Sequence, residues 1–157
     1  MTKWLSILQK NNYMGAKKHI KEGGNLNART EAGESVLAYA LKSKVDQDML
    51  ELLIENGADL FYNDDEGVSI LDFAVTYNNM FMVNLLLEKG KDVNDVTRKS
   101  GFTPLMAAVC YGRYEIFRVL LEAGSDTTAV ERKGMTALNF AQKMRKKSMI
   151  ALLEDAS

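Results

Sequence analysis

Few residues in this chain could support nucleophilic or metal chemistry. Its 157 residues include one histidine, His19, and one cysteine, Cys110. A nucleophile and its base must lie within hydrogen-bond reach, and a structural zinc site needs four ligands. A Cys/His zinc site is therefore excluded, and a catalytic pair would need the fold to bring His19 against Cys110 or a serine.

One acidic run superficially looks like a calcium-binding loop. It reads Asp64-Asp65-Glu66-Gly67. If Gly67 were the loop's central glycine, the first and last ligand positions would fall on Tyr62 and Phe73, which cannot serve. An acidic, solvated turn is the favoured interpretation. Glycine-rich phosphate loops are also missing from the sequence, so we expect no enzymatic activity, no cofactor and no metal.

The composition is that of a soluble globular chain. Apolar residues make up 46% and charged residues 26%, and the net charge is −1. The near-neutral charge argues against a general nucleic-acid binder. A single cysteine favours a reducing compartment, and neither a signal peptide nor a spanning segment is evident. We therefore expect one domain over residues 1–157, located in the cytoplasm, with no membrane contact.

The elements that must position these residues are repeated along the chain. One glycine series falls at Gly33, Gly67, Gly101 and Gly134, and a second falls at Gly23, Gly57, Gly90 and Gly124. The residues around them recur in phase, as in Gly67-Val-Ser-Ile-Leu-Asp-Phe-Ala74 and Gly134-Met-Thr-Ala-Leu-Asn-Phe-Ala141. A constant period of this kind predicts stacked units, because one unit cannot bury its apolar face alone.

Each unit is predicted to contain two helices and a turn. Ser35, Ser69, Thr103 and Thr136 stand where helix N-caps belong, and Pro104 suits the first helical position. The first helix should end near Asn78 or Gly112, which tolerate positive φ. The second should end at the second-series glycine, followed by an extended segment and a tight turn.

The pattern resembles the ankyrin-repeat family. The period and the motif Thr103-Pro104-Leu105 followed by Ala108 are typical of it. The resemblance implies an all-α solenoid of stacked helix-turn-helix units with hairpin-like turns. It covers the whole chain in units of about 1–29, 30–62, 63–96, 97–129 and 130–157, of which the first and last act as caps.

The sequence departs from the family pattern at two kinds of position. Ala38, Asp72, Met106 and Asn139 replace the usual histidine of the first helix, so its hydrogen bonds are either lost or rebuilt. One extra residue is expected between the helices of the second unit, near residues 43–47. Another lies in the loop from Gly90 to Gly101.

Charge is unevenly distributed along the chain. Residues 1–29 carry +5, residues 30–96 carry −10 and residues 97–157 carry +4. The distribution is compatible with an ordinary soluble surface of both signs. It also suits selection of a partner that presents basic groups to the middle of the chain.

The resemblance implies binding of another protein, of unknown identity, along a concave groove formed by the first helices and the turn tips. Tyr77 and Tyr111 occupy the same slot in successive repeats. Tyrosine is favoured at binding hot spots, although both rings could instead pack at the groove's rim. The candidate contact residues are Lys42, Asp65, Glu66, Thr76, Tyr77, Lys99, Phe102, Cys110, Tyr111, Arg132 and Met135.

Our main hypothesis is therefore a small, monomeric, non-enzymatic adaptor or regulator. One alternative is an accessory protein for a cofactor or redox enzyme, for example in haem or metal delivery or docking, suggested by Cys110, the tyrosines and the nine methionines. Another is an inhibitor or immunity-type protein that masks a basic partner surface with its acidic residues.

Overall fold

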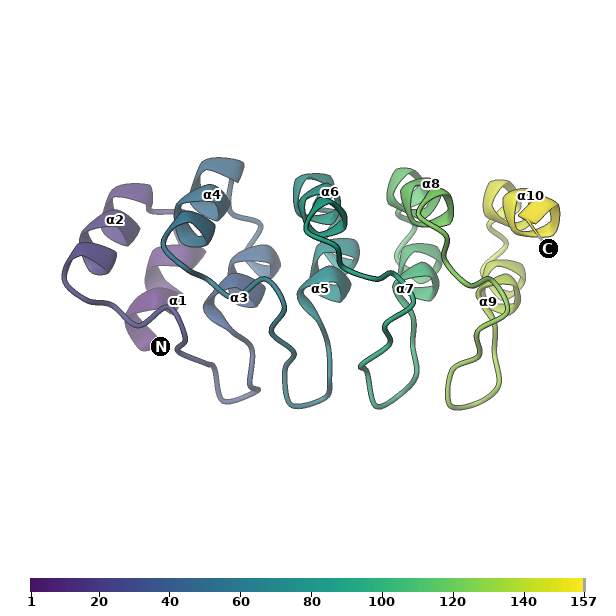
Figure 1. The fold of residues 1–157 in the computed structure, drawn as a ribbon, viewed down its shortest axis with the longest axis horizontal. Coiled ribbons are helices and arrows are strands. Elements are labelled where there is room, and N and C mark those ends of the chain that lie inside the picture. Colours follow the sequence, from purple (N-terminus) through teal and green to yellow (C-terminus); the bar gives the residue numbers. More distant parts are fainter. Residues whose placement is uncertain (157) are drawn as a thin grey trace. The chain divides into compact units, whose positions relative to one another are not determined.

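The computed structural model describes residues 1–156, in which short helices alternate with turns and hairpin loops (Figure 1). Two helices lie in each of the five predicted repeat ranges. In order they are α1 (Thr2–Gln9), α2 (Tyr13–Lys21), α3 (Val36–Lys42), α4 (Gln47–Glu55), α5 (Ile70–Thr76), α6 (Met80–Glu88), α7 (Pro104–Cys110), α8 (Tyr114–Glu122), α9 (Ala137–Lys143) and α10 (Lys147–Ala156). The predicted all-α repeat fold is confirmed.

Two compact units make up the chain, Met1–Phe73 and Ala74–Ser157, and the division passes through α5. The prediction of one domain remains a prediction. Within residues 1–156, no helix has both the length and the apolar character needed to cross a membrane.

The first unit packs α1 against α2 and α3, and α4 against α2 and α3. In Figure 1, α1 and α3 form one layer and α2 and α4 a second. Each helix turns one apolar stripe inward, as a helical repeat requires. The stripes bury Trp4, Leu8, Leu41, Met49 and Leu53, none of which is more than 1% exposed.

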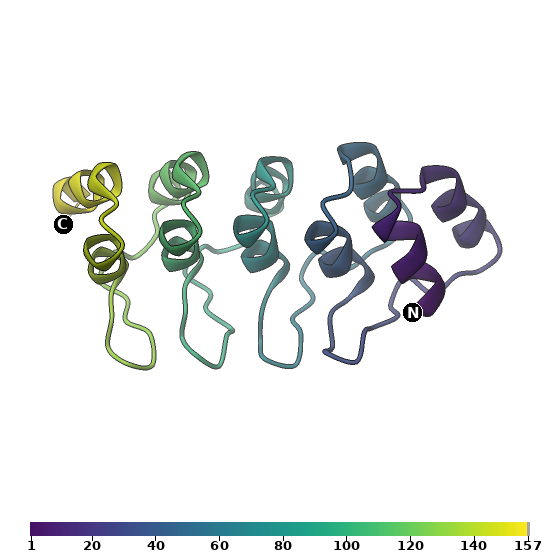
Figure 2. The same cartoon turned by 180° about the vertical axis from the view of Figure 1, so that it is seen from behind.

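The second unit repeats this plan. Helix α7 packs on α8 and α9, and α9 packs on α10. Figure 2 shows α7 and α9 in one layer, with α6, α8 and α10 in the other. Met82, Met106, Phe117 and Leu120 are completely buried. The two methionines suit this core, because their flexible side chains fill irregular gaps between helices.

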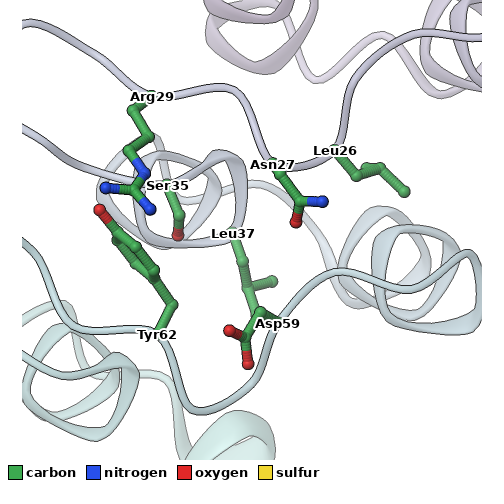
Figure 3. A pocket seen from close by; sticks show the side chains of 7 residues that line it. All are labelled: Leu26, Asn27, Arg29, Ser35, Leu37, Asp59 and Tyr62. Atoms are coloured by element: carbon green, nitrogen blue, oxygen red, sulfur yellow. The ribbon is translucent and has the colours of Figure 1, made fainter.

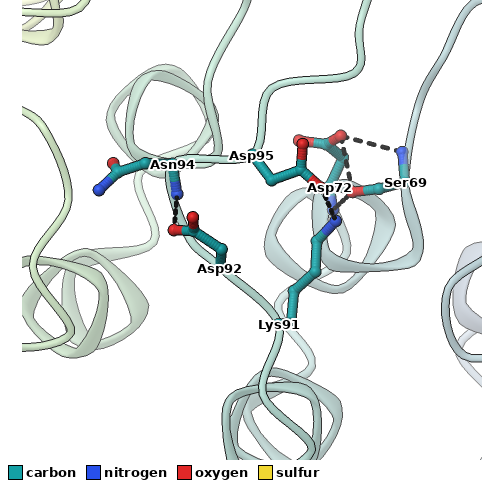
Figure 4. Close-up of polar contacts among 6 residues, drawn as sticks. All are labelled: Ser69, Asp72, Lys91, Asp92, Asn94 and Asp95. Carbon is teal, nitrogen blue, oxygen red and sulfur yellow. Dashed lines mark hydrogen bonds and ion pairs between the residues drawn. The ribbon is translucent and has the colours of Figure 1, made fainter.

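The predicted N-caps begin the first helices of four repeats. The hydroxyls of Ser35, Ser69, Thr103 and Thr136 each accept a hydrogen bond from the N–H three residues later, at 3.1 Å. In three repeats the side chain at that later position accepts in return from the N-cap N–H. The acceptors are Asp72 at 2.9 Å (Figure 4), Met106 at 3.5 Å and Asn139 at 2.9 Å.

The sequence lacks the family's usual histidine in the first helices, and these reciprocal bonds show that most repeats rebuild its hydrogen bonds. Carboxylate, thioether and amide acceptors rebuild the cap in the last three repeats. Ala38 carries no acceptor, so in the second repeat the side chain of Ser35 caps α3 without a reciprocal side-chain bond. One local function is therefore served by several residue types, provided that each can accept a hydrogen bond.

The turns between paired helices depend on left-handed backbone. Asn78 (φ 57°) and Gly112 (φ 69°) end the first helices of their repeats as predicted. Lys44 and Arg145 adopt the same conformation in other repeats, where a side chain makes it less favourable. Four residues, 43–46, separate α3 from α4, whereas three separate α5 from α6 and α7 from α8. The predicted extra residue of the second repeat is confirmed.

Candidate protein-interaction surface

The acidic run of the first unit forms the tip of a hairpin turn. Asp64 Oδ1 accepts hydrogen bonds from the N–H groups of Glu66 at 2.9 Å and Val68 at 2.8 Å, and the Asp64 N–H donates to the Val68 carbonyl at 3.0 Å. Asp64 therefore shapes the turn, while Asp65 and Glu66 are exposed at its tip. No group of three or more potential metal-ligating side chains occurs among residues 1–156.

Neighbouring hairpins of the first unit touch through small and polar groups of their turns. A Cβ added at Gly33 would lie 2.7 Å from the carboxylate of Asp65, so Gly33 leaves the space that this side chain occupies. The Tyr62 hydroxyl donates to the Gly33 carbonyl at 2.7 Å. Gly33 thus lies against two residues of the following hairpin, Tyr62 and Asp65.

A small hollow lies beside this contact (Figure 3). Its volume is about 100 Å³, and it is lined by Leu26, Asn27, Arg29, Ser35, Leu37, Asp59 and Tyr62. The guanidinium of Arg29 lies 4.6 Å from the centre of the Tyr62 ring, a stabilising cation–π geometry. Burial raises the pKa of Tyr62, so its hydroxyl remains a donor at neutral pH.

Lys42 combines exposure with a structural contact. Its ammonium lies 2.8 Å from Glu34 Oε1, and the side chain of Glu34 is only 11% exposed. Glu34 belongs to the hairpin and Lys42 to the end of α3, so the ion pair ties the turn to the helix. A partner that contacts Lys42 would meet a cation already held in place.

The two tyrosines of the predicted hot spot both lie in the second unit, but in different environments. Tyr111 is 52% exposed, whereas Tyr77 is half-buried. The guanidinium of Arg113 donates to the Thr76 carbonyl at 2.8 and 3.2 Å and so links the turn after α5 to the turn after α7. Tyr111 has the larger surface to offer a partner.

Cys110 is half-buried beside Tyr111. Burial raises the pKa of its thiol, opposed in part by the charge of Lys143. A protonated thiol is a poor nucleophile and a poor metal ligand. The position therefore favours packing over redox or metal chemistry.

Neighbouring hairpin turns of the second unit contact each other, and they also expose side chains to solvent. Phe102 packs edge-on against Phe140, with ring centres 5.5 Å apart, and the Arg98 guanidinium lies 5.3 Å from the Phe102 ring centre. The Arg132 N–H donates to the Ser100 carbonyl at 2.8 Å. Phe102 thus helps to join two repeats, and Met135 is also half-buried, while Lys99 and Arg132 are exposed.

Two further side chains of the second unit, Tyr114 and Met144, offer exposed apolar surface beside the predicted contacts. Tyr114 is 38% exposed and Met144 is 42% exposed. Met144 follows α9 at the position that Tyr111 occupies after α7. The repeat pattern of the sequence already marks Met144 as a candidate groove position, because it places Met144 in the slot of Tyr77 and Tyr111. Tyr114 was not among the candidates derived from the sequence.

His19 packs against the core of the first unit. Its ring meets Trp4 edge-on, with centres 4.8 Å apart. Burial lowers its pKa below the ordinary 6.5, with Lys3 acting in the same direction and Glu22 against it. The fold therefore favours the neutral imidazole.

This lowered pKa predicts loss of stability in mild acid. Between pH 6.5 and the lower pKa of the folded state, the unfolded chain binds more protons, so folding weakens as the pH falls through that range. We expect a lower urea midpoint at pH 5.5 than at pH 7.5. The variant His19→Gln should show a smaller change between these pH values, and an equal change would contradict the assignment.

Comparison with known proteins agrees with the repeat geometry. A family model described as ankyrin repeats in three copies matches residues 5–97, and another, described as ankyrin repeats in many copies, matches residues 86–141. The chain is 34% identical over 93 residues to the nuclear factor NF-kappa-B p105 subunit of Gallus gallus, which covers 57% of this chain and 9% of that protein.

Two further relatives show similar partial coverage. Alpha-latrotoxin-Lg1a of Latrodectus geometricus is 34% identical over 97 residues, which is 61% of this chain and 7% of the toxin. The E3 ubiquitin-protein ligase Ufd4 of Drosophila melanogaster is 32% identical over 74 residues, which is 47% of this chain and 3% of the ligase. The chain thus spans less than a tenth of each of these relatives.

Proposed function

Because the chain belongs to the ankyrin-repeat family, whose repeats are protein–protein interaction modules, we propose that it is a non-enzymatic adaptor or regulator of one partner protein. The proposed contact surface consists of the ends of the first helices and the hairpin tips within each unit. The observation that carries this proposal is the exposure of Tyr111, 52% of whose surface is open on a structurally fixed turn.

The second unit offers the aromatic part of this surface. Tyr111 follows α7 next to Arg113, whose bonds to the Thr76 carbonyl hold the neighbouring turns together. An exposed aromatic side chain on a rigid support loses little conformational entropy on binding. Lys99 and Arg132 place positive charge at the hairpin tips of the same unit.

The first unit offers an acidic surface. Asp65 and Glu66 are exposed at a turn that Asp64 closes through two backbone hydrogen bonds. Such preformed carboxylates suit a basic region of the partner. They favour, as the second candidate function, an inhibitor or immunity-type protein that masks a basic surface.

We propose a monomer that acts in the cytoplasm, because a lone cysteine suits a reducing compartment. The raised pKa of Cys110 disfavours a direct role in haem or metal ligation. An accessory role for a cofactor enzyme would then consist of binding to that enzyme as a partner protein, without ligation of its cofactor.

The proposal is tested by capture of the native partner with a Tyr111→Ala variant. If Tyr111 is a hot spot, its truncation should cost about 2 kcal/mol of binding free energy, or roughly thirtyfold in affinity. The affinity of wild type and variant for the captured protein would be compared by calorimetry.

Two control variants distinguish loss of the Tyr111 ring from a general effect of removing an aromatic side chain. Tyr111→Phe keeps the contact area and should stay within a few-fold of wild type, whereas Phe61→Ala removes a ring that is 51% exposed in the first unit outside the proposed surface. Undiminished affinity of a folded Tyr111→Ala protein would refute the assignment of Tyr111. Failure of wild type to retain any protein specifically would refute the adaptor function.

A further inference from the structure

We propose that the second unit has an additional docking surface, for an acidic peptide segment with an apolar anchor, at the turns that join α7 to α8 and α9 to α10. This inference rests on the proposed function as a protein-binding module and specifies the chemistry of one ligand. The surface, here termed the basic turn patch, consists of Tyr114, Met144, Arg145, Lys146 and Lys147.

The two turns of the basic turn patch lie against each other. A Cβ built on Gly112 would lie 3.5 Å from the ammonium of Lys146, so the α7–α8 turn lies in contact range of the α9–α10 turn. Between them is an open hollow of about 390 Å³, whose lining includes Tyr114, Arg145, Lys147 and Met149. The hollow has room for an apolar side chain, with cations along its edge.

Positive charge in the patch is concentrated in three consecutive residues. Arg145, Lys146 and Lys147 are consecutive, and no aspartate or glutamate occurs between Glu131 and Glu154. Within residues 1–156, the cations that form ion pairs include Lys18, Lys42, Lys91 and Arg118, whereas the three patch cations are not among them. In the facing turn, Glu115 follows Tyr114, and its carboxylate lies 3.9 Å from Arg118. An incoming carboxylate would therefore meet three consecutive cations.

Apolar surface adjoins this charge. Tyr114 is 38% exposed and Met144 is 42% exposed. Tyrosine gives a large contact area with few rotatable bonds, and methionine adapts its shape to a partner. Carboxylates beside a leucine or phenylalanine would satisfy both parts of the patch.

A peptide fits these features better than a nucleic acid. A nucleic-acid backbone is usually followed by cations along an extended groove or stripe. Here the cations are concentrated in one turn beside a hollow and two apolar side chains. The arrangement suits a short segment with one anchor.

The test is fluorescence polarisation of the full chain with a short labelled peptide in which Leu-Phe is flanked by glutamates. The variant combines Arg145→Asn, Lys146→Gln and Lys147→Gln, with asparagine chosen because it tolerates the positive φ of residue 145. We expect the variant to bind about tenfold more weakly or worse. A matched control, Lys17→Gln with Lys18→Gln and Lys21→Gln, removes equal charge from α2 and should bind as wild type does.

Two altered peptides and one oligonucleotide complete the test. Replacing Leu-Phe with Ala-Ala, or the glutamates with glutamines, should each weaken binding about tenfold, because the patch needs both charge and anchor. Equal binding of the Ala-Ala peptide would indicate charge attraction alone and overturn the inference. Tighter binding of a single-stranded oligonucleotide at the same residues would overturn it as well.

Changes in backbone chemical shifts locate the bound peptide. The same spectra show whether each variant is folded. Shifts centred on residues 111–114 and 143–149 support the inference, and the single variant Lys147→Gln supplies a milder change if the triple variant unfolds. Shifts confined to the hairpin tips overturn it. That result would leave the adaptor proposal intact, because native-partner capture and its Tyr111 dependence are measured separately.

Discussion

Replacement of Trp4 with alanine is expected to lower the free energy of unfolding of the first unit by about 3–5 kcal/mol. Trp4 is 1% exposed in α1, and its indole N–H donates to the Asn25 carbonyl at 3.0 Å. Truncation would open a cavity beside His19 and remove one of the two donors to that carbonyl, which also accepts from the Ala28 N–H at 3.2 Å. The loss is a large part of the stability of a small repeat unit.

Equilibrium urea unfolding followed by circular dichroism measures this effect, since tryptophan fluorescence is lost with the residue. The control Trp4→Phe keeps an aromatic ring but removes the donor, and it should cost about 1–2 kcal/mol. If Trp4→Ala and Trp4→Phe unfold at the same urea concentration, the cavity left by alanine does not lower the free energy of unfolding as predicted.

Replacement of Phe117 with alanine should destabilise the second unit by a similar amount, about 3–5 kcal/mol. Phe117 is completely buried in α8, on the same apolar face as Leu120. Its phenyl group fills space that alanine leaves empty, and close-packed interiors recover such space only in part. Hydrogen exchange should show reduced protection in residues 74–156.

Two other substitutions distinguish burial from loss of an aromatic ring. Phe117→Leu keeps most of the apolar volume and should cost less than about 1.5 kcal/mol. Phe61→Ala removes a ring that is 51% exposed, so its effect should stay within about 0.5 kcal/mol. Equal destabilisation by Phe117→Ala and Phe61→Ala would contradict the burial argument.

Local chemistry made the helices predictable from sequence. A hydroxyl before an apolar run caps a helix through a contact three residues away, as Ser35 does with the Ala38 N–H. A residue that tolerates positive φ ends a helix through its own backbone preference, as Asn78 and Gly112 do. Because these effects act within one turn, the paired helices and the extra residue between α3 and α4 could be derived without tertiary information.

The candidate contact surface was less predictable because it depends on neighbours in the next repeat. Tyr77 and Tyr111 share a sequence slot but differ in exposure. Phe102 looks like a turn-tip contact residue in the sequence, yet it packs on Phe140 of the following repeat. Stacking brings side chains of successive repeats together, and a single-repeat pattern does not describe such contacts.

By itself, the sequence determined the repeat architecture, because it depends on backbone rules and periodic burial that recur in each repeat. It also placed Tyr111 among the candidate contacts. Only the tertiary structure decided that Asp72, Met106 and Asn139 rebuild the missing cap bonds and that Lys42 is paired with Glu34. It also decided that Tyr114 lines a hollow together with Arg145 and Lys147. Those outcomes depend on side-chain geometry and on contacts with neighbouring segments, which the repeat pattern alone does not specify.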